Sequence, residues 1–184
     1  MVPELLKKSR IFHFLHQIDL DLAQQCRLSG CDHCGGPLHQ ANYPRQPWGA
    51  PKNTPDEQKI RQSLCCGREG CRKRKLPPSC LYLGRKKYWS GIIVVVMALR
   101  ENRFSDAAAK VMRMFGISYK TILRWRTWFR DVFPNSAQWK TIRGAISATV
   151  DDRRLPADLL DYFVQTKGSD EKGLIGCLQI LAAV

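Results

Sequence analysis

Four of the eight cysteines stand in two pairs whose spacing suits a metal ion. Cys31 and Cys34 form a Cys-x2-Cys pair with two glycines directly after it, and Cys66 and Cys71 follow further along the chain, separated by four residues. Two thiolate pairs brought together give a tetrahedral S4 site, which Zn²⁺ accepts without geometric penalty. A glycine after the first pair lets the chain turn so that backbone N–H groups point at the sulfurs. We therefore predict a structural Zn²⁺ bound by Cys31, Cys34, Cys66 and Cys71.

The choice of Cys66 over its neighbour Cys65 depends on strand geometry. Successive side chains of a strand point to opposite faces, so only one of these two cysteines can bind the metal. Cys66 lies nearer the tight turn at residues 67–70 and is the predicted ligand. His33 and His39 are reserve ligands.

Other uses of the cysteines fit the sequence less well. A redox Cys-x2-Cys pair needs a helix that begins immediately after it, and no such pattern follows Cys34. Plain buried thiols leave the paired spacing and the adjacent glycines unexplained. A catalytic zinc needs an open ligand position and a nearby base, and the chain has no His-x-Glu or His-Glu-x-x-His pairing. We interpret the isolated Cys26, Cys80 and Cys177 as packing residues.

A second pattern lies in the segment Gly116–Trp125. Its glycine is typical of a left-handed turn that ends one helix, Ile117 would fill the angle between two helices, and Ser118 would cap the next helix. This is the order of residues in a helix-turn-helix, whose second helix lies in the major groove of DNA. The plainer interpretation, a helical hairpin with a solvated basic face, remains open.

The helix that follows Ser118 divides into two faces at 100° per residue. Its predicted inner face consists of Ile122, Trp125, Phe129 and Val132. The opposite side is predicted to meet base edges, with Arg124 best suited to guanine, and the flank is predicted to meet phosphates. The predicted DNA readers are Tyr119, Lys120, Leu123, Arg124 and Thr127, and the predicted phosphate contacts are Arg126 and Arg130.

The positive charge is concentrated in two blocks. The chain has 184 residues and a formal net charge of +14, of which residues 59–88 carry +9 and residues 100–143 carry +7. A localised excess is what a phosphate backbone selects for, because each neutralised phosphate releases a counterion. The basic run Arg72, Lys73, Arg74 and Lys75 could track RNA as well as DNA, and Tyr43 and Trp48 in the proline-rich loop are candidates for stacking on single strands.

The remaining elements follow from hydrophobic spacing and from turn residues. Apolar residues at helical spacing predict a helix over 3–28, with Leu6 and Phe14 broadening its apolar side. The proline-rich stretch after Pro37 is expected to be an extended surface loop without a regular element. Short strands are predicted at 60–66 and 72–76. Helices are predicted over 89–102, from Ser105 to Gly116, from Ser118 to Pro134, and over 136–146 and 156–166.

We expect a mainly α fold with a small β zinc ribbon. The predicted order is an N-terminal helix (1–30), a zinc-ribbon-like domain with a proline-rich loop (31–83), a three-helix helix-turn-helix domain (84–135) and a C-terminal helical extension (136–184). The helix over 89–102 is a choice, since Ile92–Val96 favours a strand by propensity. The apolar end at 173–184 is expected to pack on the fold or on a protein partner.

The cysteine ribbon followed by Gly-Ile-Ser-x-x-Thr-Ile-x-Arg-Trp resembles the N-terminal DNA-binding regions of bacterial insertion-sequence transposases. It is similar also to the small accessory proteins encoded beside them. The resemblance covers residues 31–135 and implies that the four cysteines bind metal and that Tyr119, Lys120 and Arg124 read DNA. In those families a separate integrase-like domain cuts. Here no third domain with three spaced carboxylates follows, and the acidic residues crowd one segment: Asp151, Asp152, Asp158 and Asp161.

The sequence therefore predicts a zinc-stabilised, sequence-specific protein that binds duplex DNA and has no catalytic site. It would serve as a transposition accessory factor of a mobile element or as a transcriptional regulator. The alternative is a subunit of a ribonucleoprotein that holds RNA through the basic ribbon. No apolar run is long enough to cross a bilayer and no secretion signal is evident, so we expect a bacterial cytoplasmic location at the nucleoid.

Overall fold

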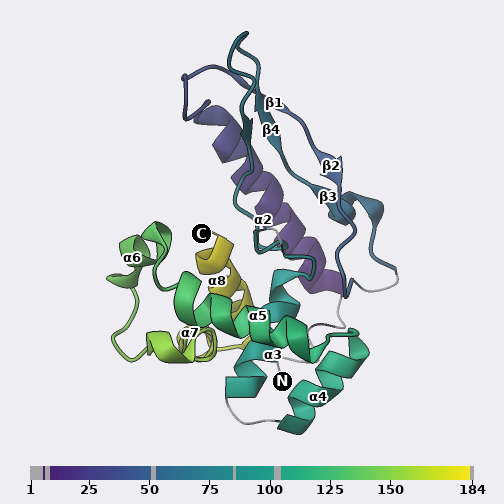
Figure 1. Cartoon of the computed structure of the whole chain (residues 1–184), viewed down its shortest axis with the longest axis vertical. Coiled ribbons are helices and arrows are strands. Elements are labelled where there is room, and N and C mark those ends of the chain that lie inside the picture. Colours follow the sequence, from purple (N-terminus) through teal and green to yellow (C-terminus); the bar gives the residue numbers. More distant parts are fainter. Residues whose placement is uncertain (1–5, 7–8, 51–52, 85, 102–104, 183–184) are drawn as a thin grey trace.

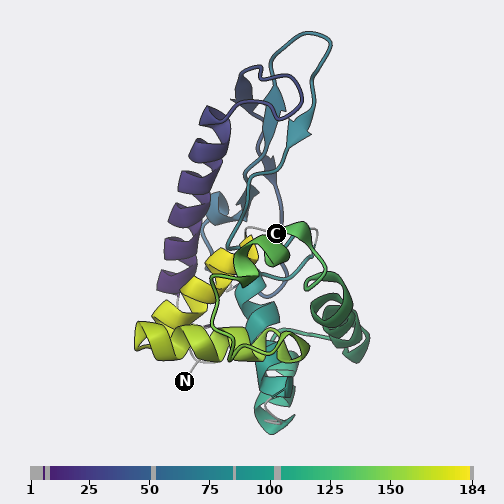
Figure 2. The same cartoon turned by 90° about the vertical axis from the view of Figure 1, so that its left-hand side faces the viewer.

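The computed structural model describes residues 6, 9–50, 53–84, 86–101 and 105–182. The molecule is elongated, with small strands at one end and a group of helices at the other (Figures 1 and 2). The long helix α2 (Ser9–Leu28) runs from the helical group toward the strands. The predicted mainly helical fold with a small β part is confirmed. No helix among the described residues is long and apolar enough to cross a membrane.

Three short strands make an antiparallel sheet near the cysteines. The strands are β1 (Leu38–Gln40), β4 (Leu64–Cys66) and β5 (Arg74–Lys75), in the order β1-β4-β5. Leu38 pairs with Cys66, and Cys65 pairs with Arg74 across the hairpin. The two predicted strand regions therefore contain strands, and β1 is an addition that the sequence did not indicate.

The expectation that the proline-rich stretch has no regular element is wrong in part. Tyr43 and Pro44 form strand β2, which pairs with β3 (Ile60–Arg61), and the short helix η1 (Asp56–Lys59) precedes β3. Proline is compatible with an edge strand, because its φ is extended and an edge position does not require its missing N–H. The backbone N–H of Arg45 continues the pairing by donating to the carbonyl of Lys59 at 2.6 Å.

Helix α2 joins the two ends of the molecule. Leu6, Ile11, Phe12 and Leu15 are buried against the helical group, and the rings of Phe12 and Trp89 lie 4.2 Å apart between centroids. Phe14 was predicted to belong to the apolar side, but it is half exposed. It lies outside the face that meets the core.

A buried polar contact fastens α2 to the chain beyond β5. Asp19 is buried and accepts hydrogen bonds from the hydroxyl of Ser79 and from the backbone N–H of Cys80. Arg61 is buried nearby and donates from Nη2 to the carbonyl of Pro77 at 2.6 Å. Desolvation by burial raises the pKa of Asp19 to about 6, although the hydrogen bonds from Ser79 and Cys80 and the charge of Arg61 oppose it.

Helix α3 (Ser90–Glu101) is the centre of the helical group. Every residue from Ser90 to Ala98 is buried, and the helix packs against α4, α5, α7 and α8. A helix that is covered on all sides is apolar all round, which accounts for the run Ile92–Val96. The choice of helix over strand is confirmed, and burial overrides the intrinsic β propensity of this segment.

Helices α4 (Ser105–Met114) and α5 (Tyr119–Thr127) follow, and the π-helical turn η2 (Trp128–Val132) extends α5. The predicted inner face holds for Ile122, Trp125 and Phe129, which are buried, but Val132 is 53% exposed. The N–H of Phe133 donates to the carbonyl of Trp128 at 2.8 Å, five residues back. This wider turn inserts one residue into the helical register, so Phe133 takes the core position predicted for Val132.

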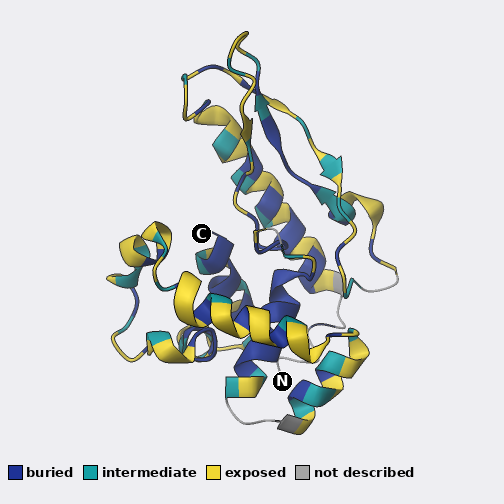
Figure 3. Cartoon of the chain, in the orientation of Figure 1, coloured by how far each residue is buried: buried dark blue, intermediate teal, exposed yellow. Residues whose placement is uncertain are grey.

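The chain ends with α6 (Ala137–Arg143), the short helix η3 (Asp152–Arg154), α7 (Ala157–Lys167) and α8 (Asp170–Ala182). Helix α8 packs on the fold, as expected for residues 173–182, and much of its ribbon is coloured as buried (Figure 3). Its buried residues include Leu174, Cys177 and Leu178. One apolar core includes α3, α5, α7 and α8, so it crosses the boundary predicted after residue 135. A second, small core contains Cys31, Leu38, Leu64 and Cys66.

Candidate metal centre and nucleic-acid interface

The first cysteine pair lies in a loop that closes on itself just after α2. Gly30 adopts a φ of 77°, and the N–H of Cys31 then donates to the carbonyl of Gly36 at 3.0 Å. The N–H of Gly35 donates back to the carbonyl of Cys31 at 2.8 Å. In this turn the backbone N–H groups of His33 and Cys34 point at the sulfur of Cys31, as the glycine pattern predicted.

The second pair lies on the β4–β5 hairpin. Cys66 ends β4, and its N–H donates to the carbonyl of Lys73 at 2.9 Å. Cys71 lies in the turn, where its N–H donates to the carbonyl of Arg68 at 3.2 Å. The N–H of Arg68 points at the sulfur of Cys66, and that of Lys73 points at the sulfur of Cys71. Both pairs thus direct backbone dipoles toward sulfur, an arrangement that stabilises thiolates.

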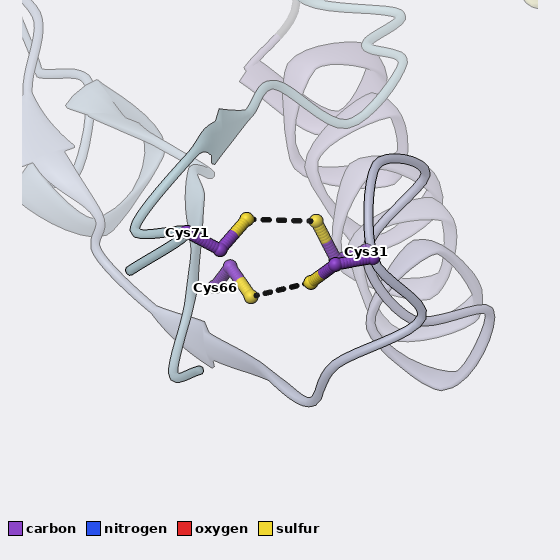
Figure 4. Close-up of side chains that lie close together, drawn as sticks. Cys31, Cys66 and Cys71 are labelled. Atoms are coloured by element: carbon purple, nitrogen blue, oxygen red, sulfur yellow. Dashed lines mark hydrogen bonds between the residues drawn. The ribbon is translucent and has the colours of Figure 1, made fainter. Parts of the chain in front are cut away.

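The four sulfurs converge between the loop and the hairpin (Figure 4). Sγ of Cys31 lies 3.8 Å from Sγ of Cys71, Sγ of Cys34 lies 3.5 Å from Sγ of Cys66, and all four sulfurs lie within 4.8 Å of one another. A tetrahedral zinc with Zn–S bonds of about 2.3 Å requires S···S separations of about 3.8 Å, whereas a disulfide requires about 2.05 Å. The cluster can hold a metal ion, and all eight cysteines are free thiols.

Gly36 has no side chain, and the space that a Cβ would need there is bordered by two of the sulfurs. A Cβ at this position would lie 3.1 Å from Sγ of Cys66, 3.2 Å from Sγ of Cys34 and 3.1 Å from Cβ of Arg68. These separations are tighter than ordinary van der Waals contact. The second glycine after Cys34 therefore brings the backbone close to the sulfurs.

Cys65 points away from the cluster. Its Sγ lies 3.5 Å from the carbonyl oxygen of Arg72, on the other face of the strand from Cys66. The structure thus brings Cys66, and not Cys65, together with the other three cysteines. His33 and His39 are exposed and do not belong to the group. No helix begins after Cys34, since Gly35–Pro37 leads into β1.

The surroundings act in opposite directions on the thiols of Cys31 and Cys66. Hydrogen bonds from the backbone N–H groups of His33 and Cys34 lower the pKa of Cys31 to about 7. For Cys66 the N–H of Arg68 acts in the same direction, but burial and the neighbouring cysteine side chains prevail and raise the pKa to about 12. Four thiolates this close repel one another, and a bound divalent cation would compensate that repulsion.

Potential metal ligands other than these four cysteines do not form a second cluster among the described residues. Within the described ranges, the cysteine group is the one cluster of three or more His, Cys, Asp or Glu side chains that could hold a metal. The acidic C-terminal residues are engaged in the protein: Asp152 accepts from Nε of Arg143 at 2.9 Å and from Nε1 of Trp139 at 3.2 Å. Asp158 accepts from the N–H of Asp151 at 3.1 Å and pairs with Arg154.

The basic run beyond Cys71 does not act as one unit. Arg72, Lys73 and Arg74 are exposed. Lys75, in contrast, forms an ion pair with Asp32, which raises its pKa, and donates to Oγ of Ser29 at 3.3 Å. Lys75 therefore ties the hairpin to the loop of the first cysteine pair. Its ammonium group is engaged in these contacts, whereas the sequence predicted that it would bind nucleic acid.

The turn before α5 has the predicted local structure. Gly116 adopts a φ of 62°, Ile117 is buried, and the side chain of Ser118 caps α5 by accepting from the N–H of Thr121 at 3.3 Å. The hydroxyl of Tyr88 donates to the carbonyl of Gly116 at 3.1 Å and holds the turn against the core. The angle at which α5 leaves the core is thus set by buried groups.

The residues predicted to read bases share the exposed side of α5. Leu123 is 43% exposed and Tyr119 is 60% exposed. The remaining polar members of the predicted reading face and flank are also exposed: Lys120, Arg124, Arg126 and Thr127. Arg130 differs, because its guanidinium donates to both carboxylate oxygens of Asp131 at 2.7 Å. That pairing occupies the group that was predicted to bind a phosphate.

Sequence reasoning missed cationic side chains that flank α5. The guanidinium of Arg100, at the end of α3, lies 5.9 Å from the centre of the Tyr119 ring. The ammonium of Lys86 lies 3.6 Å from the centre of the Trp128 ring. Trp48, which the sequence predicted as a candidate for stacking on single strands, is half exposed and lies edge-on to Tyr88, 5.5 Å between centroids. Only their positive or aromatic character was visible in the sequence, because the contacts join distant segments.

Comparisons with protein-family models, with curated proteins and with solved structures gave no match.

Proposed function

We propose that this protein is a zinc-stabilised, sequence-specific DNA-binding protein, whose ribbon is formed around the four cysteines and whose α5 enters the major groove. The observation that carries the proposal is the exposed face of α5. Lys120, Arg124 and Arg126 are exposed there, and in the described part of the chain no carboxylate pairs with them. Cations left without partners on a helix that follows a capped, buried turn are suited to an anionic partner.

Zinc is the metal that the donor set favours. Four sulfur ligands select a soft or borderline cation, and S···S separations of 3.5 and 3.8 Å match the edge of a tetrahedral ZnS4 site. Four protein ligands complete the coordination of the ion, so its role is structural. It would hold together strands of two or three residues that form only a small core.

The two basic regions would bind separate parts of a duplex. The β4–β5 hairpin and α5 lie at different ends of the elongated molecule (Figure 1). Contacts from Arg72, Lys73 and Arg74 to phosphates would add affinity without reading sequence, whereas Arg124 on α5 would read a base. Together with the resemblance to insertion-sequence transposases, this division supports a role in recognising the ends of a mobile element.

Selection from a randomised duplex library, followed by titration of the selected site, tests the proposal. Replacing Arg124 by Ala should weaken binding to the selected site by about 1–3 kcal/mol and relax the preference at one base pair. Lys140→Ala is the matched control, because this lysine is exposed on α6, away from α5. A protein with no measurable affinity for duplex DNA at low salt, or an Arg124→Ala variant that equals the control, would contradict the proposal.

The second candidate function is RNA binding by the ribbon as part of a ribonucleoprotein. The observation that favours it is the exposure of Arg72, Lys73 and Arg74 next to the cysteine cluster. Such a cluster can follow a nucleic-acid backbone without reading base edges. Titration with structured RNA and with duplex DNA of equal length, at equal salt, separates the two. Tighter binding of RNA that is abolished by replacing these three residues would favour the second candidate.

A further inference from the structure

A cleft of about 260 Å³ lies between α3 and the exposed face of α5. Its apolar wall includes Met97 and Ile122, which are buried, and its charged lining comes from Arg100, Glu101 and Arg126. Pockets that hold drug-sized ligands start at about 300 Å³, so this cleft suits a smaller group.

The cleft borders the predicted reading face of α5. Tyr119, Leu123 and Arg126 line it and follow one another at spacings of four and three, which places them in one stripe along the helix. Lys120, Arg124 and Thr127 are each one residue further along the chain and form the neighbouring stripe. A duplex whose base edges meet that second stripe therefore passes one of its strands along the cleft.

The guanidinium groups of the cleft are available, in contrast to others nearby. Arg100 faces α5, with its guanidinium 5.9 Å from the centre of the Tyr119 ring, and no carboxylate within the described ranges forms an ion pair with Arg100 or Arg126. Arg130 and Arg143, by comparison, are each paired with an aspartate. Guanidinium groups bind phosphate oxygens through two parallel hydrogen bonds.

We infer that this cleft binds one backbone phosphate of the DNA, with Arg100 and Arg126 as its ligands from two different helices. The inference rests on the proposed function and deepens it, because it assigns the strand contact that Arg130 was predicted to make. The carboxylate of Glu101 lines the same cleft and opposes the anion. It limits the affinity of this site, since like charges repel.

The test measures the affinity of the full chain for a selected duplex and for an unrelated duplex over a series of salt concentrations. Arg100→Ala should weaken binding to both duplexes by the same factor, about five- to tenfold, and reduce the slope of log K against log salt by about 1. Arg126→Ala should do the same. Glu101→Gln should act in the opposite direction and tighten binding to both duplexes about two- to fivefold at low salt.

Arg113→Ala is the matched control, because this arginine is exposed on the neighbouring helix α4 and does not line the cleft. Melting curves of all variants show whether they remain folded. A wild-type protein that binds no duplex would overturn the proposed function and this inference with it. Three results would overturn the inference alone, provided that the wild-type protein binds DNA. Arg100→Ala could bind as tightly as Arg113→Ala, or it could change the base preference while the salt slope stays the same. The third such result is weaker binding by Glu101→Gln.

Discussion

The cysteine end and the helical end of this molecule are stabilised in different ways. The helical end has a core that runs from Leu6 to Ala182 and surrounds α3, which is buried from Ser90 to Ala98. The cysteine end has strands of two or three residues and a core of four buried residues, two of which are cysteines of the cluster. Apolar burial scales with area, so the second region cannot offset its own loss of conformational entropy without cross-links.

Because the two ends are stabilised by different interactions, we expect them to unfold independently. The part of α2 that carries Leu15 belongs to the large core, whereas its last turns carry exposed residues such as Leu28. Between them lies the buried polar contact of Asp19 with Ser79 and Cys80. Loss of the metal should therefore disorder the cysteine end of the molecule, on the far side of this contact from the helices, and leave the helical end folded.

The strongest change is expected at the cysteine end when one of the four cysteines proposed to bind the metal is replaced. Structural zinc contributes about 10–16 kcal/mol of apparent binding free energy in small zinc modules, so Cys66→Ser or a strong chelator should unfold the cysteine loop and the three-stranded sheet, residues 31–40 and 64–76. Amide exchange resolved by segment should become fast there and remain slow in α3, α7 and α8. Cys65→Ser is the control, because that thiol points away from the cluster. Simultaneous exposure of both ends would show that the two regions are one cooperative unit.

The next effect belongs to the helical core and tests the π-helical turn. Phe133 is fully buried and Val132 is 53% exposed. Phe133→Ala should lower the free energy of unfolding by about 3–5 kcal/mol, because it leaves a cavity. Val132→Ala should change it by less than about 0.5 kcal/mol. Urea denaturation followed by tryptophan fluorescence measures both, and a reversed order of the two variants would contradict the wider turn.

A smaller, pH-dependent effect is expected at the contact that joins the two ends. Burial raises the pKa of Asp19 from 3.8 to about 6, so the folded state binds a proton that the unfolded state releases between these values. Stability linked to this group is therefore present below pH 4 and lost as the pH rises through 6, by about 3 kcal/mol in total. Denaturant titrations at pH 4, 5, 6 and 7 should show this trend as the difference between wild type and Asp19→Asn.

The quantity to compare is the difference in stability between wild type and Asp19→Asn at each pH, because His16 changes the stability with pH in the opposite direction. Burial lowers the pKa of His16, so that group alone destabilises the fold as the pH falls below 6.5. Both proteins contain His16, and its contribution is common to them. A pH-independent difference between wild type and Asp19→Asn would contradict the raised pKa.

The smallest effect is expected at Gly36. A methyl group there would lie 3.1–3.2 Å from two of the sulfurs, so Gly36→Ala should weaken binding of the proposed zinc about tenfold. Competition with a chromophoric chelator measures the change. Gly144→Ala is the control, because a Cβ at that position meets no atom within 4 Å. An unchanged affinity would show that the loop can move away from the sulfurs at no cost.

Local patterns were sufficient where the signal lies within a few residues. The glycines next to Cys34, the turn at Gly116 and the cap at Ser118 each work through the chain beside them, and the structure has all three features as predicted. Local patterns did not predict contacts that depend on residues far along the chain. The ion pair of Lys75 depends on Asp32, and the strand at Tyr43 depends on pairing with Arg61. Arg130 is a different case, because it pairs with its immediate neighbour Asp131, a local contact that the prediction of helix faces did not consider.

Spacing, turn residues and charge are local properties of a chain, so the sequence was sufficient to predict the four clustered cysteines, the two basic blocks and most of the helices, although it did not indicate α8. Packing in three dimensions sets which cations have no partner among the described residues. It also places Phe133 in the core instead of Val132 and brings Arg100 to face Tyr119 across a cleft. These outcomes depend on packing between distant segments. Burial and charge pairing act through space, and a linear pattern does not contain the distances on which they depend.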